Sequence, residues 1–275
     1  MDNNINELIE KYKLSKEDHD RVLEILKEYL FTDKIVSDKP SVMLVIGQPG
    51  SGKTTYINNT DLSKYIIINS DNYRSYNKYS EEILDKYPTN YAKLTNYDAH
   101  LWGDELFTYA IQNGYSVLRE KAPTDYSLLE TIKSIPDNYE VIVNVMAVGD
   151  LTSILATRKR YEEELLSKKS AKLSNFESHN KCYELLPFIV DECLSLKIKL
   201  NYILPIDNRF EIISINDNNS NLLDKFRRES NDKTLVKSEI ILNNIKESMT
   251  KRKAVKEEFD ELDRINTIID NLKQK

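Results

Sequence analysis

The sequence predicts an α/β fold in which a parallel β-sheet is flanked by helices. Three observations predict it. Short, continuous apolar runs recur along the chain, segments with helical periodicity lie between them, and a glycine-rich loop at 47–54 follows the first run. Continuous apolar runs are typical of strands buried on both faces. Their alternation with helices indicates parallel strands joined by helical crossovers.

The expected elements follow in chain order. Residues 1–38 read as two short helices, because Ser15 and Asp18 form a capping-box pattern before a helical apolar stripe. Lys39-Pro40 marks a break before the first strand. The expected strands are Val42–Ile46, Tyr65–Ile68, Tyr115–Leu118 and Val141–Val148, with closing strands at Tyr202–Leu204 and Glu211–Ile215. The expected helices between them are 53–60, 97–113, 124–134, 151–167 and 175–196.

The last part of the chain has a different character. An Asn-rich segment at Asp217–Asn221 leads into a charged stretch, roughly 237–273, with apolar residues at helical spacing. We expect an appended helix or hairpin that packs on the domain; a helix that binds a partner or self-associates is the alternative. The expected organisation is an N-terminal helical segment (1–38), an α/β domain (39–216) and a charged helical extension (217–275).

Charge and cysteine usage narrow the class of protein. Lys and Arg number 39 against 45 Asp and Glu, a formal net charge of −6, which argues against nucleic acid as the main partner. No apolar run approaches the length of a membrane span and the start lacks a signal-peptide pattern, so we expect a cytoplasmic protein without a membrane partner. Cys182 and Cys193 lie far from any His or Cys cluster and read as small apolar residues of a helix core.

The strongest motif is a phosphate-binding loop. The run Gly47-Gln48-Pro49-Gly50-Ser51-Gly52-Lys53-Thr54 fits G-x-x-x-x-G-K-[ST] without a gap. Glycines let successive N–H groups converge on phosphate oxygens, Lys53 brings a charge to the β- and γ-phosphates, and Thr54 offers a hydroxyl to Mg²⁺. Chance would produce the pattern in roughly 1% of chains of this length. The sequence therefore predicts a P-loop NTPase-type fold that binds ATP or GTP with Mg²⁺ through residues 47–55.

Two acidic residues follow expected strands. Asp71, in Asn69-Ser70-Asp71, comes after the second strand, and Glu120 ends the third. Loops at the carboxyl ends of parallel strands share one edge, where ligands bind. There Asp71 could accept the proton of a hydroxyl that attacks the γ-phosphate, with capping of the next turn as its alternative role. Glu120 could bind a polar substrate, and a pairing with Arg119 or Lys121 is its alternative.

The fourth expected strand lacks the acidic end that motor ATPases and GTPases carry. Asp150 comes two residues later and reads as a helix N-cap, which disfavours those classes and leaves a second protein contact to Mg²⁺ unassigned. Arg158 and Arg160 lie on the following helix. A guanidinium brought to the γ-phosphate stabilises charge in the transition state, while a solvated charged face is the alternative reading.

Taken together and in order, these segments resemble the zeta-toxin family of P-loop kinases. The resemblance covers roughly residues 40 to 200. It rests on Gly47–Thr55, Asp71–Arg74, Glu120, Asn144–Val148 leading to Arg160–Glu162, Ser178-His179 and Leu185–Pro187. Members of the family phosphorylate UDP-N-acetylglucosamine on its amino sugar and are toxins held in check by a small antitoxin.

The resemblance implies a role for each matching residue. Lys53 and Thr54 would bind the phosphates and Mg²⁺, Asp71 would be the general base, and Arg160 the arginine at the γ-phosphate. Gly47–Thr55 and Arg158 would belong to the nucleotide site, as would Lys172, which stands where the family carries a second arginine. Asp71, Arg74 and Glu120 would contact the acceptor. His179 matches a family histidine and reads as a structural hydrogen-bonding residue.

Three segments depart from the family pattern, and the last of them stands where the family has its sugar-nucleotide site. Asn69 replaces an Asp, Ser75–Lys78 replaces a His-Pro pair, and Glu120-Lys121-Ala122 stands in place of Glu-Gly-Thr. Taken as a whole, the resemblance implies a kinase that moves the γ-phosphate of ATP or GTP to a nucleotide sugar. UDP-N-acetylglucosamine is the first expected acceptor. The alternatives are another acceptor (a different nucleotide sugar, a nucleoside, an antibiotic or a nucleic-acid end) or a non-catalytic nucleotide-dependent binding module.

Overall fold

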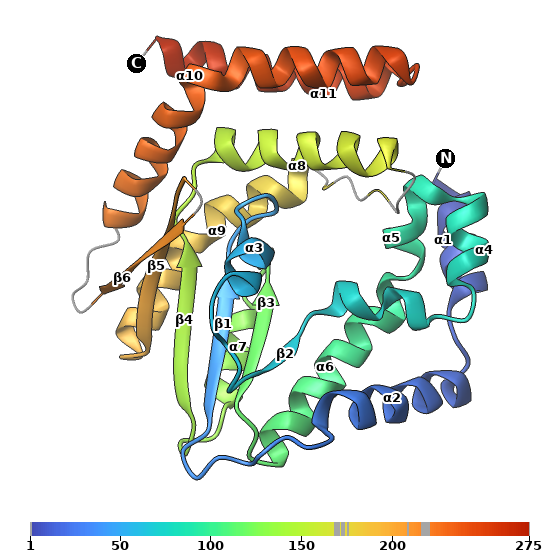
Figure 1. Ribbon diagram of the computed structural model, residues 1–275, viewed down its shortest axis with the longest axis vertical. Helices are drawn as coiled ribbons and strands as arrows, with labels where there is room; N and C mark the ends of the chain where they lie inside the picture. Colours follow the sequence, from blue (N-terminus) through green and yellow to red (C-terminus); the bar gives the residue numbers. More distant parts are fainter. Residues whose placement is uncertain are drawn as a thin grey trace.

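A computed structural model shows a single six-stranded sheet flanked by helices (Figure 1). It describes residues 2–167, 171, 174, 176–207, 209–215 and 221–274. The strands are β1 (Ser41–Ile46), β2 (Ile66–Ile68), β3 (Val117–Lys121), β4 (Glu140–Met146), β5 (Lys199–Ile206) and β6 (Arg209–Ile215). The α/β fold class predicted from the sequence is confirmed.

The strand order is β2-β3-β1-β4-β5-β6, so β1 lies at the centre. All neighbouring pairs are parallel except β5 and β6, which form an antiparallel hairpin. Within this register Val45 of β1 lies between Glu120 of β3 and Asn144 of β4. The loop that follows β1 is thus flanked by the carboxyl ends of β3 and β4, where ligands bind in open parallel sheets.

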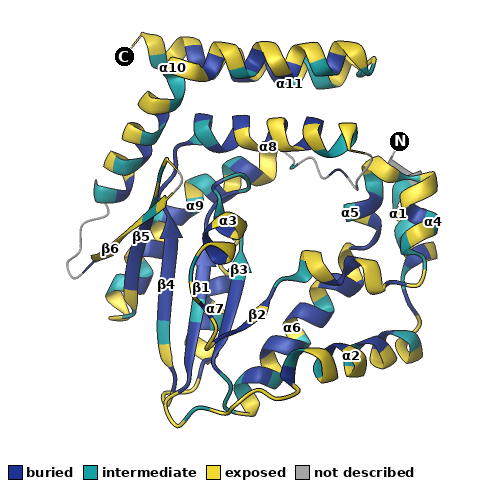
Figure 2. Ribbon diagram, viewed as in Figure 1, coloured by how far each residue is buried: buried dark blue, intermediate teal, exposed yellow. Residues whose placement is uncertain are grey.

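The expected helices of the α/β domain are all present. They are α3 (Lys53–Asn58), α6 (Asn96–Gln112), α7 (Ser127–Ser134), α8 (Asp150–Leu166) and α9 (Phe176–Ser195). Alternation along the strands separates two faces: Val42, Leu44 and Ile46 join a core with α6, α7 and α9, whereas Val45 joins a smaller core with α3. Figure 2 shows the central strands β1 and β4 buried along most of their length, whereas the edge strand β6 is largely exposed. No described helix is both long and apolar enough to cross a membrane.

The N-terminal helices α1 (Asp2–Tyr12) and α2 (Lys16–Phe31) pack onto the domain. Ser15 accepts a hydrogen bond from the Asp18 amide (3.2 Å), which confirms the predicted cap. On α2, His19 lies between two carboxylates of α6 and its carbonyl accepts a bond from Trp102 Nε1 (3.1 Å). Helix α2 therefore shares the main core, whereas Tyr12 of α1 packs in a separate cluster with Ile83, Tyr91 and Leu94.

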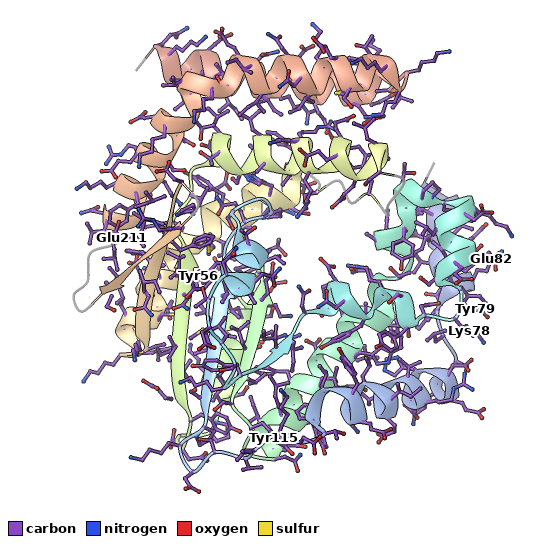
Figure 3. All side chains as sticks on the ribbon, viewed as in Figure 1. Tyr56, Lys78, Tyr79, Glu82, Tyr115 and Glu211 are labelled. Atoms are coloured by element: carbon purple, nitrogen blue, oxygen red, sulfur yellow. The ribbon has the colours of Figure 1, made fainter. Side chains whose placement is uncertain are left out.

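Between β2 and α6 the chain forms short helices that the sequence analysis does not predict. They are η1 (Ser70–Tyr76), α4 (Ser80–Lys86), η2 (Pro88–Asn90) and α5 (Tyr91–Leu94). The Tyr12 hydroxyl of α1 donates to Glu82 (3.0 Å), and its ring meets Tyr79 edge-on. Figure 3 shows Tyr79 and Glu82 on the side of the molecule opposite β6.

The C-terminal part is a helical hairpin of α10 (Asn221–Lys251) and α11 (Lys256–Lys273). α10 begins well before the charged stretch from which we predicted a helix, and the turn passes through Lys253 with φ of 58°. Both helices pack along α8 (Figure 1). At the start of α8, a Cβ added to Gly149 would lie 1.9 Å from Asn231 Oδ1 of α10. The proposed boundary at 216/217 lies outside the described residues.

Candidate functional site

A polar cavity of about 620 Å³ opens at the carboxyl ends of β1, β2 and β3. Its walls come from the phosphate-type loop with the start of α3, from the end of β2 with η1, from the segment after β3 with α7, and from α8. Five side chains expected to act in catalysis or binding line this one cavity: Lys53, Thr54, Asp71, Glu120 and Arg160. The topology thus brings together residues that lie far apart in the sequence.

The loop has the backbone that its glycines predict. Gly50 and Gly52 have φ of 79° and 89°, in the left-handed region that favours glycine. A Cβ on Gly50 would lie 2.0 Å from the Ser153 carbonyl oxygen of α8, so a larger residue would push the loop off that helix. Lys53 is 7% exposed, and its Nζ donates to the carbonyls of Gly47 (2.8 Å) and Gln48 (3.1 Å). Pro49 and Thr55 also line the cavity.

Helices α8 and α9 brace the loop from behind. Gln48 is fully buried, and its Nε2 donates to the Val148 carbonyl (2.8 Å) and to Ser153 Oγ (3.1 Å). Ser153 Oγ lies 2.8 Å from His179 Nε2 of α9, and burial lowers the pKa of His179. Buried Gln48 Oε1 and Ser51 Oγ have no hydrogen-bond partner among the described atoms. The loop residues before Lys53 that line the cavity are Pro49, Gly50 and Gly52.

A polar ladder fixes α3 to the sheet. The Tyr56 hydroxyl of α3 accepts a hydrogen bond from Asn144 Nδ2 of β4 (3.1 Å); Figure 3 labels Tyr56 where α3 meets β4. Asn144 Oδ1 accepts from Asn201 Nδ2 of β5 (2.8 Å), whose own Oδ1 accepts from Ser214 Oγ of β6 (2.8 Å). This ladder explains a buried Asn at the centre of a strand that otherwise reads as apolar.

Glu120 joins the loop to the end of β2. Its carboxylate accepts from Thr54 Oγ1 (3.0 and 3.2 Å) and from Asn69 Nδ2 (3.2 Å), and it lies 4.0 Å from Lys53 Nζ. Asn69 Oδ1 also accepts from the Asp71 amide (3.0 Å), which caps η1. The amide at 69 can donate to Glu120, whereas the Asp of the family pattern would place a second negative charge there.

Arg74 holds Asp71 in place. Its Nε and Nη2 donate to Asp71 Oδ1 (2.9 and 2.6 Å), and it also bonds the Ala92 carbonyl, Thr95 and Asn96. Arg74 is 5% exposed and is not part of the cavity wall. The structure therefore places it behind Asp71, where it orients the carboxylate, rather than at a surface that a substrate could touch.

The two arginines of α8 lie on opposite sides of the helix. Arg160 lines the cavity, with its side chain 47% exposed and Nε 3.6 Å from Glu164. Arg158 is 2% exposed and pairs with Glu258 and Glu261 of α11. Arg158, expected at the nucleotide, thus belongs to the contact with the C-terminal hairpin. Lys172, the other expected nucleotide residue, lies outside the described residues.

The cavity is also lined by residues that the sequence analysis does not predict to be functional. His100 of α6, and Asp125, Ser127 and Thr131 at or near the start of α7, all line it. No motif precedes or follows His100, so no signal could have found it. Lys121 lines the same wall, and its replacement of a family glycine was visible in the sequence.

Comparisons with known proteins agree with this fold. The family model described as Zeta toxin matches residues 27–221. Toxin zeta of Streptococcus agalactiae is 27% identical over 140 residues. The proteins of the same name from Streptococcus pyogenes and Enterococcus hirae are each 26% identical over 140 residues. Each match covers 49% of this chain and 49% of the relative, so the chain spans about half the length of the curated relatives it matches.

Solved structures share the fold. A chain from the PezAT chromosomal toxin-antitoxin system of Streptococcus pneumoniae matches with a TM-score of 0.69 at 21% identity, covering 85% of this chain and 98% of that chain. A chain from AvrRxo1-ORF1:-ORF2 with ATP matches with a TM-score of 0.51 at 10% identity, covering 77% of this chain and 71% of that one. Because the family model spans well over half of the sequence, this protein belongs to the zeta toxin family.

Proposed function

We propose that this protein is a kinase that transfers the γ-phosphate of ATP or GTP to a hydroxyl group of a nucleotide sugar, with UDP-N-acetylglucosamine as the first candidate. The proposal rests on one observation: Lys53 of the loop and Asp71 of η1 line the same cavity. Membership of the zeta toxin family supports phosphoryl transfer at this cavity.

Each wall of the cavity would supply one part of the reaction. Lys53 and the loop amides would hold the phosphates, and Asp71, oriented by Arg74, would accept the proton of the acceptor hydroxyl. As that oxygen bonds to the γ-phosphorus, the bond to the β-phosphate oxygen breaks and the nucleoside diphosphate leaves with its electron pair. Arg160 would stabilise the charge on the transferring group from the α8 side.

The residues beside the loop fit Mg²⁺. The Thr54 hydroxyl and the Glu120 carboxylate, 3.0 Å apart, present oxygen atoms, which this ion prefers. Within the described parts of the chain there is no group of three or more His, Cys, Asp or Glu that could hold a metal. Phosphate oxygens and water would therefore supply its other ligands, and the ion would neutralise phosphate charge there.

Substitution of the base tests the mechanism. Asp71→Asn keeps the shape of the side chain but not its charge, so we expect phosphoryl transfer to fall by about 10²- to 10⁴-fold while ATP still binds. Transfer to UDP-N-acetylglucosamine would be followed with labelled ATP, and ATP affinity by calorimetry. Asp85→Asn on the exposed face of α4 is the matched control. Transfer at the wild-type rate by the Asp71 variant would remove the proposed base.

The acceptor itself needs an unbiased assay. Incubating the protein with labelled ATP and a metabolite extract, and identifying the labelled product by mass spectrometry, would distinguish a nucleotide sugar from another acceptor. A labelled nucleoside or antibiotic, with UDP-N-acetylglucosamine untouched, would contradict the proposed substrate and keep the kinase.

We also propose a toxin role with a small antitoxin as partner. Family membership supports it, as does the likeness to a chain of a toxin-antitoxin system. An antitoxin that covers the cavity would stop transfer, since the proposed reacting groups all line it. Growth of a host that expresses the protein is the readout that tests this role.

A further inference from the structure

Helix α8, which presents Arg160 to the cavity, packs on the C-terminal hairpin formed by α10 and α11. Its buried apolar residues Leu151, Ile154 and Leu155 share one cluster with residues of those two helices, whereas the strands of the sheet belong to two other clusters. Ser153, near the start of α8, is bonded to the phosphate loop. Figure 1 shows α8 between the hairpin and the sheet. The cavity wall that carries Arg160 therefore shares its apolar core with the hairpin.

Buried polar contacts hold the turn of α8 that contains Arg160. Arg158 donates to the Glu258 carbonyl of α11 (3.2 Å). One helical turn later, Glu162 accepts two hydrogen bonds from Arg252 in the turn of the hairpin (2.9 and 2.8 Å). The side chains of Arg158 and Glu162 are 3% and 4% exposed, so water and salt screen these contacts little.

The direction of Arg160 depends on these contacts. Residues two apart on a helix point to nearly opposite sides, so Arg160 lies opposite Arg158 and Glu162. Its Nε lies 3.6 Å from Glu164, but that residue belongs to the same helix and moves with it. Ala156, one turn before Arg160, lines the same cavity. The hairpin contacts of Arg158 and Glu162 thus decide which side of α8 faces the cavity.

Stability alone does not explain a buried ion cluster at this place. Apolar residues of similar size often stabilise a fold as well as a buried ion pair does, because charges lose hydration on burial. What the charges add is geometry. Apolar side chains tolerate small rotations of a helix, whereas a guanidinium that bonds a carboxylate through two nitrogens, as Arg252 bonds Glu162, fits in one orientation.

We infer that Arg252 is a positioning residue: through Glu162 it holds α8 in the orientation that brings Arg160 to the γ-phosphate of the bound nucleotide. The inference rests on the proposed function for the role of Arg160 at that phosphate. It gives the C-terminal hairpin a part in the reaction, although none of its described residues lines the cavity.

Nucleotide binding tests this without any acceptor. ADP and a non-hydrolysable ATP analogue would be titrated with Mg²⁺ into the full chain by calorimetry. Arg160→Met should weaken binding of the analogue about tenfold or more, as loss of a hydrogen bond to a charged group does, and leave the affinity for ADP unchanged. Arg252→Met should show the same selective loss, because the loop that holds the phosphates shared by both nucleotides stays in place.

A double-variant cycle separates positioning from general weakening. If Arg252 acts through Arg160, Arg252→Met weakens binding of the analogue in the wild type but adds nothing in Arg160→Met. Glu162→Gln breaks the same link from the α8 side and should follow the same pattern. It decides the test if Arg252→Met fails to bind ADP. Lys273→Met, which removes an exposed pair of the same hairpin, should leave both affinities unchanged.

The outcomes are distinct for the two proposals. Unchanged affinity for the analogue in Arg252→Met and Glu162→Gln, equal losses for both nucleotides in Glu162→Gln, or additive losses in the double variant would overturn the inference. Wild-type affinity for the analogue in Arg160→Met would overturn it too, while phosphoryl transfer by the wild type would still support the kinase. The expected binding pattern without transfer to any acceptor would instead count against the kinase and leave this inference standing.

Discussion

At the scale of single residues, Arg74 and Arg158 are each held by carboxylates of the protein, and the loop takes its shape from its glycines. Gly50 and Gly52 take the positive φ angles that the loop pattern requires, since that pattern encodes backbone shape directly. The sequence analysis predicts that Arg74 and Arg158 bind ligands, but each is buried and bonded to protein partners. A sequence shows that a guanidinium is present, but which carboxylate pairs with it depends on the fold.

His179 gives a prediction about stability and pH. Burial lowers its pKa from the ordinary value of 6.5, so the folded chain holds a neutral imidazole where the unfolded chain would be protonated. Below about pH 6.5 the unfolded state therefore binds an extra proton, and stability should fall with pH by at most ~1.4 kcal/mol per unit. In His179→Gln this part of the pH dependence should vanish.

Urea unfolding at pH 7.5, 6.5 and 5.5 measures the effect. Ion pairs of Asp and Glu also weaken on acidification, at lower pH. Wild type and variant share these pairs, so the difference between their free energies of unfolding reports on His179 alone. Parallel curves for the two proteins would show that His179 is not held neutral.

At the scale of elements, α8 connects the cavity to the C-terminal hairpin. Arg158 and Glu162 are one helical turn apart and face the hairpin, whereas Arg160 lies between them in sequence and faces the cavity. Arg252, in the turn of the hairpin, donates to both Glu162 and Glu258. The spacing of apolar residues predicts a charged helix here, but nothing in that spacing indicates this ion-pair cluster.

Removing the central cation should weaken the whole element. The hydrogen bonds that Arg252 donates to Glu162 and Glu258 raise the pKa of Arg252, and Arg252→Met would leave these two largely buried carboxylates without that partner. We expect a loss of about 3–5 kcal/mol in the free energy of unfolding, measured with urea. Lys273→Met removes an exposed pair with Glu239 and should leave the unfolding midpoint where it was. Similar midpoints for both variants would mean that the cluster contributes little.

At the scale of the whole molecule, periodicity predicted the sheet and its helices but not how the ends of the chain dock. Strand and helix positions follow from local patterns, which is why β1, β3, β4 and the helices between them were found. The contacts of α2 with α6, and of α10 with α8, join distant segments through polar side chains such as His19 and Asn231. Such contacts have no local signature, and the short helices after β2 had none either.

The toxin role gives a prediction for the intact protein in a cell. Expression should arrest growth, and Lys53→Ala should relieve the arrest, because the loop would lose the charge that holds the phosphates. Plating efficiency after induction, with protein levels compared by immunoblot, measures both. Arrest by the Lys53 variant at equal expression would separate toxicity from phosphoryl transfer, and harmless expression of an active enzyme would indicate a housekeeping kinase.

The close approach of α10 to Gly149 makes this position sensitive to substitution. The atom that any other residue would add at 149 falls on Asn231, whose amide also bonds Asp150 (2.6 Å). Enlarging that position would therefore force α10 away from α8, the helix that carries Arg160. Spontaneous inactivating mutations need not strike the phosphate loop at all, and a lineage that has silenced the protein could keep every reacting group unchanged.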